Sequence, residues 1–400
     1  MYQLSNTIRD YDWGSRTSMA QIFGREATGS PEAEMWIGAH PGAPSRRSGD
    51  GEGLNALIDA DPQGALGEKI AARFGRLPFL LKVLAAQEPL SLQVHPNLEQ
   101  AAAGFADEQA NGPELSSPQR NYRDDQHKPE MIVALTPFEA LSGFRNTEAA
   151  ALAFDWLASH VTEQSAVEAA QTIAEALRAG DLAPAVALIL QADDGVRRLA
   201  LLGARAVDAE PEAALAADAS LGLLPRLAGF HPGDTGTLLA LLLNLVSLQP
   251  GQAMALQAGN IHAYLHGTGI EIMANSDNVL RGGLTTKHVD VPELLRVVRF
   301  ETLEPQMVQP QELGDGAELY ASGFEEFDLL RLSHSAEPAR LPAHGPSAVI
   351  VTSGTLTLSN AAGDHLVLGP GESAFITAAD GHVTAEGDER LEAFVGLPAL

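Results

Sequence analysis

The sequence contains no cysteine. Disulfide bonds, thiolate zinc sites and a cysteine nucleophile are therefore excluded. Any metal centre must use nitrogen and oxygen ligands, such as imidazole, carboxylate, amide or water.

Long apolar runs are also missing. The longest, Leu238–Val246, is interrupted by Asn244 and falls well short of the roughly 20 residues that a membrane-spanning helix needs. The first residues, MYQLSNTIRDYDWG, do not place a basic segment before an apolar one, as a secretory signal would. We therefore expect a cytoplasmic protein with no membrane partner.

Positive charge is scarce. The chain has 25 Lys and Arg against 52 Asp and Glu, which gives a formal net charge of −27. Such a surface repels nucleic acid and anionic membranes, and no run of basic residues offsets it. We therefore expect no nucleic-acid partner. We also expect a monomer rather than an oligomer, although the charge does not decide this. Any anionic small molecule must be neutralised locally, by a few Lys or Arg side chains in a cleft.

The chain of 400 residues, 45% of them hydrophobic, is long enough for two or three domains. Short apolar runs separated by Gly and Pro predict strands over residues 1–146 and again over 231–315. Between them, Ala-rich segments of helical period, such as Ala150–Arg178, predict a helical insertion over 147–230. Residues 316–400 return to strand signals, which predicts a second, smaller β domain.

The most distinctive stretch runs from Val246 to Gly283. A Pro250-Gly251 turn between two apolar runs predicts a hairpin, and Gly259-Asn260-Ile261-His262 follows. This spacing resembles the second half of the cupin pattern, with Gln257 where that pattern has Pro. His262 would then point into the mouth of a small β-barrel, where a neutral imidazole suits zinc, copper or iron. In the last domain, residues 366–376 repeat the strand, Pro-Gly turn, strand layout, but His365 and His382 lack ligand spacing. A second barrel without metal is predicted there.

Two upstream stretches supply partners for His262. In an extended Leu90–Pro96 segment, Gln93 and His95 share one face because alternate side chains of a strand point the same way. In His127-Lys128-Pro129-Glu130-Met131, Lys128 and Glu130 share a face for the same reason. Glu99 is a rival carboxylate at the cupin spacing, but it follows Pro96 at the start of a predicted helix, so we prefer Glu130.

Together with the sequence segments around them, these candidate ligands resemble the corresponding residues of type I mannose-6-phosphate isomerase. The resemblance implies two cupin-like (jelly-roll) β domains with an inserted helical domain, and one zinc ion held by Gln93, His95, Glu130 and His262. It also implies interconversion of mannose 6-phosphate and fructose 6-phosphate, which feeds mannose metabolism and GDP-mannose supply, with Arg281 in the active site. The matching stretches are AEMWIGAHPGAPS (33–45), residues 78–96, HKPEM (127–131), residues 140–144 and residues 259–290.

Physical chemistry suggests further roles. Arg281 remains protonated, so we expect it to stabilise the negative charge of an enediolate rather than to act as a base. Three alternatives stay open for the base: Lys128, Glu271 and a metal-bound hydroxide. Lys82, Ser91 and Lys287 lie in the matched stretches and are the expected contacts of the substrate phosphate.

Structural roles and a non-catalytic function are the alternatives to these assignments. Asp277 is a turn residue or orients Arg281 through a salt bridge, and Trp13, Trp36 and Tyr264 belong to the core or to a cleft wall. We expect no catalytic group in the insertion between Thr147 and Ala228. A sugar-binding protein of two cupin domains, without chemistry, is the main alternative function; it would have little need for Arg281 and Lys128 beside a metal.

Overall fold

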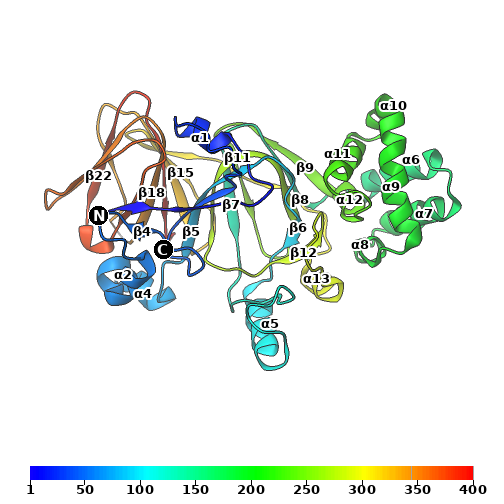
Figure 1. Ribbon diagram of the computed structural model, residues 1–400, viewed down its shortest axis with the longest axis horizontal. Helices are drawn as coiled ribbons and strands as arrows, with labels where there is room; N and C mark the ends of the chain where they lie inside the picture. The colour runs from blue at the N-terminus through cyan, green and yellow to red at the C-terminus, as the bar shows by residue number, and fades with distance from the viewer. Residues whose placement is uncertain (344, 400) are drawn as a thin grey trace.

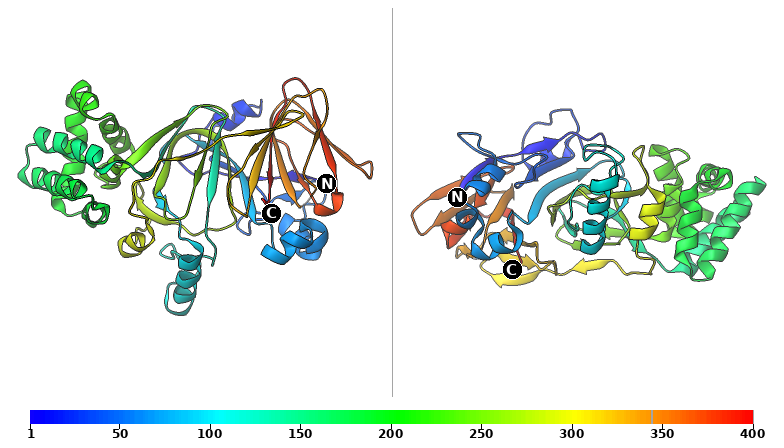
Figure 2. Two further views of the ribbon diagram at one scale, coloured as in Figure 1. Left: turned by 180° about the vertical axis from the view of Figure 1, so that it is seen from behind. Right: turned by 90° about the horizontal axis from the view of Figure 1, so that it is seen from below.

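The computed structural model describes residues 1–343 and 345–399. Two β regions lie side by side, and a helical region extends from the far end of one of them (Figures 1 and 2). Both termini lie at the end opposite the helices. This arrangement confirms the predicted fold class, which is mainly β with an α insertion. No helix within these residues is both long and apolar enough to cross a membrane.

The central β region is a curved 11-stranded sheet. Its longest strand, β11 (His262–Ala274), pairs with β5 (Phe79–Ala86) and β7 (Glu130–Ala134) along its second half. Near its start it pairs with β6 (Leu92–Val94) and β8 (Phe138–Phe144). One strand thus connects both parts of the barrel wall. The remaining strands are β2 (Thr7–Arg9), β3 (Glu34–Ile37), β9 (Leu243–Leu248), β10 (Ala253–Leu256), β12 (Leu280–Gly283) and β13 (Gln306–Val308).

The Pro250-Gly251 turn joins β9 to β10 but does not make a hairpin. Strand β9 pairs with β8, whereas β10 pairs with β7 and β13. The predicted hairpin register is therefore wrong. Gly251 has a φ of +85°, which glycine tolerates, and the chain uses this turn to cross from one side of the barrel to the other. This crossing is typical of a jelly roll, in which successive strands alternate between facing sheets.

The second β region packs an eight-stranded sheet against a four-stranded one. The Ser353-Gly354 turn does not make a hairpin either. It joins β18 (Ser347–Ser353), which pairs with β21 (Ser373–Ile376) and β23 (Glu392–Leu397), to β19 (Leu356–Asn360), which pairs with β20 (His365–Leu368) and β22 (Val383–Gly387). Aliphatic side chains such as Leu330, Val349 and Leu356 fill the space between the sheets. The larger sheet contains β14 (Gln311–Gly314), β15 (Ala317–Tyr320), β16 (Asp328–Ser333), β18, β21 and β23; the smaller contains β17 (Ala339–Arg340), β19, β20 and β22.

The N-terminal strand completes this second region. Strand β1 (Tyr2–Ser5) pairs with β21, and β4 (Arg46–Arg47) pairs with β1. The N-terminal ammonium donates to Asp380 Oδ1 at 2.7 Å, next to the short helix η3 (Ala378–Asp380). The beginning and end of the chain are thus held in one sheet.

The helical region follows β8 and returns the chain to β9. Its periodic pattern is interrupted at residues 161–163, so the segment predicted over Ala150–Arg178 forms two helices, α6 (Thr147–His160) and α7 (Gln164–Arg178). Their apolar faces share one core with barrel residues such as Val94 and Leu141. The region continues through α8 (Leu182–Gln191), α9 (Asp194–Ala209), α10 (Pro211–Ala217), η1 (Ala219–Gly222), α11 (Leu223–Phe230), α12 (Gly236–Leu239) and η2 (Ala240–Leu242).

Further helices lie outside the insertion. One of them, α5 (Leu98–Asn111), begins after His95, where Asn97 and Gln100 form a capping box. The others are α1 (Ser18–Ile22), α2 (Leu54–Ala60), α3 (Pro62–Leu66), α4 (Glu68–Phe74) and α13 (Val291–Val297).

Candidate active site

Strand ends bring the predicted metal ligands together. Gln93 lies in β6 directly opposite His262, the first residue of β11. His95 follows the end of β6, and Glu130 is the first residue of β7. Residues about 170 positions apart in the chain therefore share one small volume.

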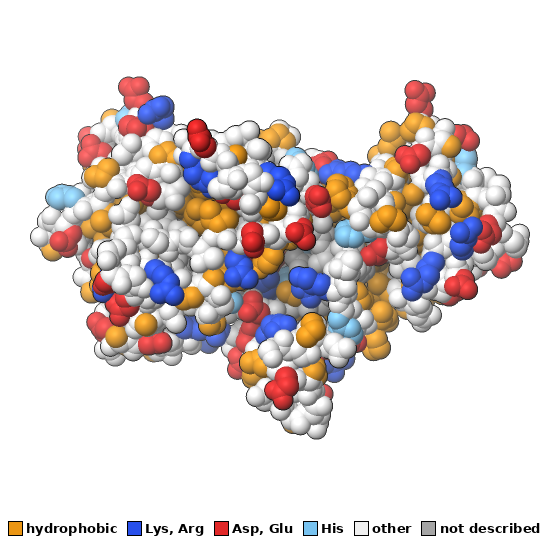
Figure 3. Space-filling model, viewed as in Figure 1, with side chains coloured by type: hydrophobic (Ala, Val, Ile, Leu, Met, Phe, Trp, Pro, Cys, Tyr) orange, Lys and Arg blue, Asp and Glu red, His pale blue; other side chains and the backbone are white. Residues whose placement is uncertain are grey.

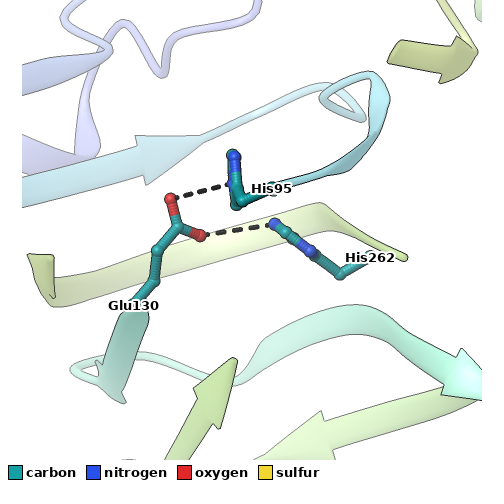
Figure 4. A group of neighbouring side chains, drawn as sticks. All are labelled: His95, Glu130 and His262. Carbon is teal, nitrogen blue, oxygen red and sulfur yellow. Dashed lines mark ion pairs between the residues drawn. The ribbon is translucent and has the colours of Figure 1, made fainter. Parts of the chain in front are cut away.

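His95, Glu130 and His262 form a cluster whose candidate ligand atoms all lie within 4.8 Å of one another. Figure 4 shows both imidazole rings turned toward the Glu130 carboxylate. His95 Nε2 is 3.3 Å from Glu130 Oε1, and His262 Nε2 is 3.3 Å from Glu130 Oε2. The amide of Gln93 lies 3.3 Å from His262 Nε2. Glu99 is exposed on α5 and lies outside this cluster.

Backbone carbonyls fix the orientation of both imidazoles. The Nδ1 of His95 lies 2.7 Å from the carbonyl oxygen of Asn278, and that of His262 lies 2.9 Å from the carbonyl of Asn260. A carbonyl only accepts, so each Nδ1 carries the proton and each Nε2 presents a lone pair to the cluster. His95 Nε2 and Glu130 Oε2 are buried and have no hydrogen-bond partner. Such orphaned groups are costly in a protein interior unless something else binds them, so this donor set fits a metal ion.

The charges of the cluster also suit a metal. Burial lowers the pKa of His95 to about 4, so its ring is neutral at pH 7. Burial alone would raise the pKa of Glu130, but the nearby Lys128 and His95 hold it well below the ordinary carboxyl range. Lys128 Nζ lies 3.0 Å from Glu130 Oε1. Two neutral imidazoles and one carboxylate leave a zinc ion with net positive charge.

Beside the cluster lies a cleft of about 650 Å³. Figure 3 shows a hollow near the middle of one face of the molecule, with both basic and acidic side chains around it. The cleft brings together all three predicted phosphate contacts and three of the seven other predicted site residues. They are Lys82, Ser91, Gln93, Lys128, Arg281 and Lys287. Five carboxylates, those of Asp10, Asp12, Glu34, Glu88 and Asp277, line the same cleft. The few Lys and Arg side chains that the charge balance predicted in a cleft are therefore present, but the cleft as a whole is not basic.

The cluster residues His95, Glu130 and His262 do not line the cleft, and neither does the predicted base Glu271. The Oε2 of Glu271 accepts from Lys82 Nζ at 2.9 Å, and Glu34 Oε1 lies 3.6 Å from the same ammonium. Burial opposes the charge of Lys82, but Glu271 and Glu34 outweigh that effect and raise its pKa. Burial raises the pKa of Glu271. The structure therefore places Glu271 behind Lys82, as a partner that keeps the lysine charged.

Arg281 and Lys287 have no ion pair within residues 1–343 and 345–399. Burial and the neighbouring Arg123 lower the pKa of Arg281, while burial and Arg281 lower that of Lys287. Asp277 does not pair with Arg281, so that interpretation is wrong; its Oδ1 lies 3.3 Å from His40 Nε2. His40 Nδ1 accepts the backbone N–H of Gly42 at 3.0 Å, which leaves Nε2–H free to donate to Asp277.

Sequence reasoning missed several residues of the cleft wall. Asp277, His40 and Glu34 line the cleft, and so do Phe230 and His231 at the end of α11. Trp13 and Trp36, predicted as core or cleft wall, also line it. A histidine or acid beside a turn gives no local signal of function, because only the fold brings these residues to one cavity.

The fold and the site define a cupin with a buried metal-type ligand cluster beside a cleft that contains four Lys and Arg side chains. A family model described as phosphomannose isomerase type I, catalytic domain, matches residues 1–147. Mannose-6-phosphate isomerase of Escherichia coli (strain K12) is 38% identical to the chain and covers 98% of each protein. The chain therefore belongs to the type I mannose-6-phosphate isomerase family, which confirms the predicted resemblance.

More distant relatives and solved structures agree. Mannose-6-phosphate isomerase of Aspergillus fumigatus is 31% identical over 88% of this chain and 87% of that protein. A mutant phosphomannose isomerase from Salmonella typhimurium is 35% identical, with a TM-score of 0.89 over 100% of both chains. A mannose 6-phosphate isomerase crystallised with zinc and yttrium is 36% identical, with a TM-score of 0.87 over 99% of this chain and 98% of that one.

Proposed function

We propose that the protein is a zinc-dependent aldose–ketose isomerase that interconverts mannose 6-phosphate and fructose 6-phosphate. The observation that carries the proposal is the buried His95–Glu130–His262 cluster, in which two ligand atoms have no hydrogen-bond partner, beside a cleft that holds four cationic side chains. Gln93, His95, Glu130 and His262 would hold the zinc ion. When bound, zinc acts as a Lewis acid that polarises a sugar oxygen.

The overall reaction sets the proton balance. When the aldose is converted to the ketose, the hydrogen on C2 leaves as a proton and a proton is added to C1. At the same time O2 loses its proton to become a carbonyl and O1 gains one to become a hydroxyl. An enediolate lies between the two sugars, so the site must stabilise negative charge on adjacent oxygens.

Arg281 is assigned to that charge. Its guanidinium lines the cleft and has no carboxylate partner among the described residues, so its donors are available to substrate oxygens. A rigid fork of N–H groups spans two adjacent oxygens better than an ammonium does. Ser91 and Lys287 line the same cleft and are assigned to the phosphate, with Lys82 contributing its charge from the wall.

Proton transfer is assigned to two of the groups that line the cleft, Lys128 and Asp277. Burial raises the pKa of Asp277, but the hydrogen bond from His40 outweighs burial and keeps this carboxylate ionised. An ionised carboxylate is a competent general base for a carbon acid next to a carbonyl. Lys128 is assigned to the sugar oxygens. Glu271 is not assigned this step, because it lies behind Lys82.

A coupled assay tests the proposal directly. Fructose 6-phosphate released from mannose 6-phosphate is measured with purified protein whose zinc content has been determined. Turnover that depends on zinc and disappears in His262→Ala is expected. Tight binding of mannose 6-phosphate by the wild type, without turnover at full zinc occupancy, would instead favour the sugar-binding alternative. Light scattering in the same buffer tests our further proposal that the protein is a monomer.

A further inference from the structure

Asn278 is a completely buried polar side chain just before β12, with an exposed fraction of 0%. Its Oδ1 accepts the backbone N–H groups of Arg123 and Asp124 at 2.7 and 3.2 Å. Its Nδ2 donates to the carbonyl oxygens of Asp124 and Gln126, both at 2.8 Å, and to Asp124 Oδ1 at 3.2 Å. The amide group thereby uses its donors and acceptor on one loop, residues 123–126.

The backbone of the same residue contacts the metal cluster. The carbonyl of Asn278 accepts from His95 Nδ1 at 2.7 Å, and this is the bond that turns His95 Nε2 toward Glu130. Asn278 therefore faces a cluster ligand with its main chain and a loop with its side chain.

That loop leads directly into the cluster and the cleft. Residue 126 is followed by His127, Lys128 and Glu130, of which Lys128 lines the cleft and Glu130 belongs to the cluster. On the other side, Asn278 is three residues before Arg281. One residue is thus placed, through its main chain and its side chain together, to hold three functional groups in register: His95, the Lys128–Glu130 pair and Arg281.

Neighbouring bonds show that the contact is built from both sides. Asp124 Oδ1 accepts from the Ser276 hydroxyl at 2.8 Å, and Asp124 Oδ2 accepts the backbone N–H of Asp277 at 2.9 Å. Asp124 and Asn278 therefore join the two segments by reciprocal side-chain-to-backbone bonds. By contrast, the side chain of Asn275 in the same segment makes one long bond, from Nδ2 to the carbonyl of Leu77 at 3.5 Å.

We propose that Asn278 is a positioning residue that couples the loop 123–126 to His95 and so sets the geometry of the metal cluster before any metal binds. The proposal rests on the proposed zinc site. Outer partners of metal-ligating histidines change metal affinity by about 10–100-fold when they are removed. Asn278 should act in this range, although it contributes no ligand.

The test compares Asn278→Ala and Asn278→Asp with the wild type and with Asn275→Ala as a matched control. Zinc affinity is measured by competition with a chromogenic chelator, and exchange of the Arg123 and Asp124 amides is measured by NMR on the metal-free protein. We expect zinc binding to weaken by about 10–100-fold in both Asn278 variants and to stay within about twofold of wild type in the control. Asn278→Ala should also speed exchange at both amides, while Asn278→Asp keeps their acceptor and should spare them.

A purely structural role would lower the melting temperature without these two changes. Unchanged zinc affinity in folded Asn278→Ala overturns the proposal, and so does an equal loss in Asn275→Ala. If the Asn278 variants do not fold, Ser276→Ala loosens the same loop from the other side and must weaken zinc binding for the proposal to stand. Failure of the wild type to bind zinc would instead reject the proposed function, while amide exchange would still report whether Asn278 holds the loop.

Discussion

Gly236 and Gly283 meet backbone to backbone where the helical region returns to the active site. A β-carbon on Gly236 would lie 2.7 Å from the backbone nitrogen of Leu284 and 2.9 Å from the Cα of Gly283. The carboxylate of Asp234 holds the same junction, accepting from the N–H of Gly236 at 2.7 Å and of Thr285 at 3.2 Å. The position of Arg281, two residues before Gly283, therefore depends on how the helical region packs against this segment.

The first prediction concerns this contact. Gly236→Ala adds a methyl group where backbone blocks it, and overpacking of this kind costs about 1–3 kcal/mol. We expect lower kcat with zinc content unchanged, because the displaced segment carries Arg281. Gly229→Ala is the control: nothing lies within 4 Å of its added β-carbon, and it sits in α11, where alanine should stabilise by about 0.5–1 kcal/mol. Equal kcat values for the two variants would contradict the idea.

The second prediction concerns the ligands. His95→Ala or His262→Ala should lose both bound zinc and activity, because each removes one donor from a closed cluster and leaves the Glu130 carboxylate poorly compensated. Gln93→Ala should be milder, since a neutral amide contributes least to the affinity. Metal analysis after dialysis, beside the coupled assay, checks both statements. Full zinc occupancy in either histidine variant would show that the ligand set is wrong.

The sequence allowed the cluster to be predicted because strand periodicity is local. Gln93 and His95 share a face by their spacing alone. The sequence segments around Glu130 and His262 carried the family resemblance. Which strands pair was not predictable in this way. The Pro250-Gly251 and Ser353-Gly354 turns look like hairpin turns, yet both send the chain to the opposite sheet, and only the packing of distant strands decides between these outcomes.

Long-range electrostatics were equally hidden. Glu271 looked like a base because it lies between motifs in the chain, but its cross-strand partner is Lys82, and this pairing turns it into a counter-ion. Asp277 looked like a turn residue, and only His40, which is more than 200 positions away in the chain, shows that its carboxylate is held toward the cleft. A single sequence contains no signal for either relationship.

The third prediction concerns pH. Arg145, just before the insertion, donates from NH1 to Asp218 Oδ2 at 2.8 Å and from Nε to the Leu241 carbonyl at 2.7 Å. Burial tends to raise the pKa of Asp218, but its hydrogen bond with Arg145 outweighs burial and lowers it below the ordinary 3.8. The unfolded chain therefore binds the proton more tightly, so this stabilisation is complete above the unfolded pKa and is lost as pH falls through the folded one.

Asp218→Asn tests that sign. At pH 7 it should lower the free energy of unfolding by about 1 kcal/mol or less, since solvent screens a partly exposed pair. The difference from wild type should stay constant between about pH 5 and 8 and shrink below about pH 4, because ordinary carboxyl groups titrate near there. Urea unfolding at several pH values measures it. A difference that grows toward low pH would mean that the sign is wrong.

The last prediction is that Arg281→Lys will not rescue the role of Arg281 in the chemical step. Arg281 lies on β12 opposite Gln93, so its guanidinium reaches the cleft beside the metal cluster rather than at the rim. If its fork of donors stabilises an enediolate, lysine replaces two aligned donors with one point charge.

The loss should then appear in kcat, by about 2.7–4 kcal/mol if a single oxyanion-hole donor is the guide. Lys287→Ala is the matched comparison, because removing a phosphate contact weakens ground-state and transition-state binding alike and should mainly raise KM. Both variants are assayed with zinc content confirmed as equal to wild type. A near-normal kcat with a raised KM in Arg281→Lys would assign Arg281 to phosphate binding and end its catalytic role.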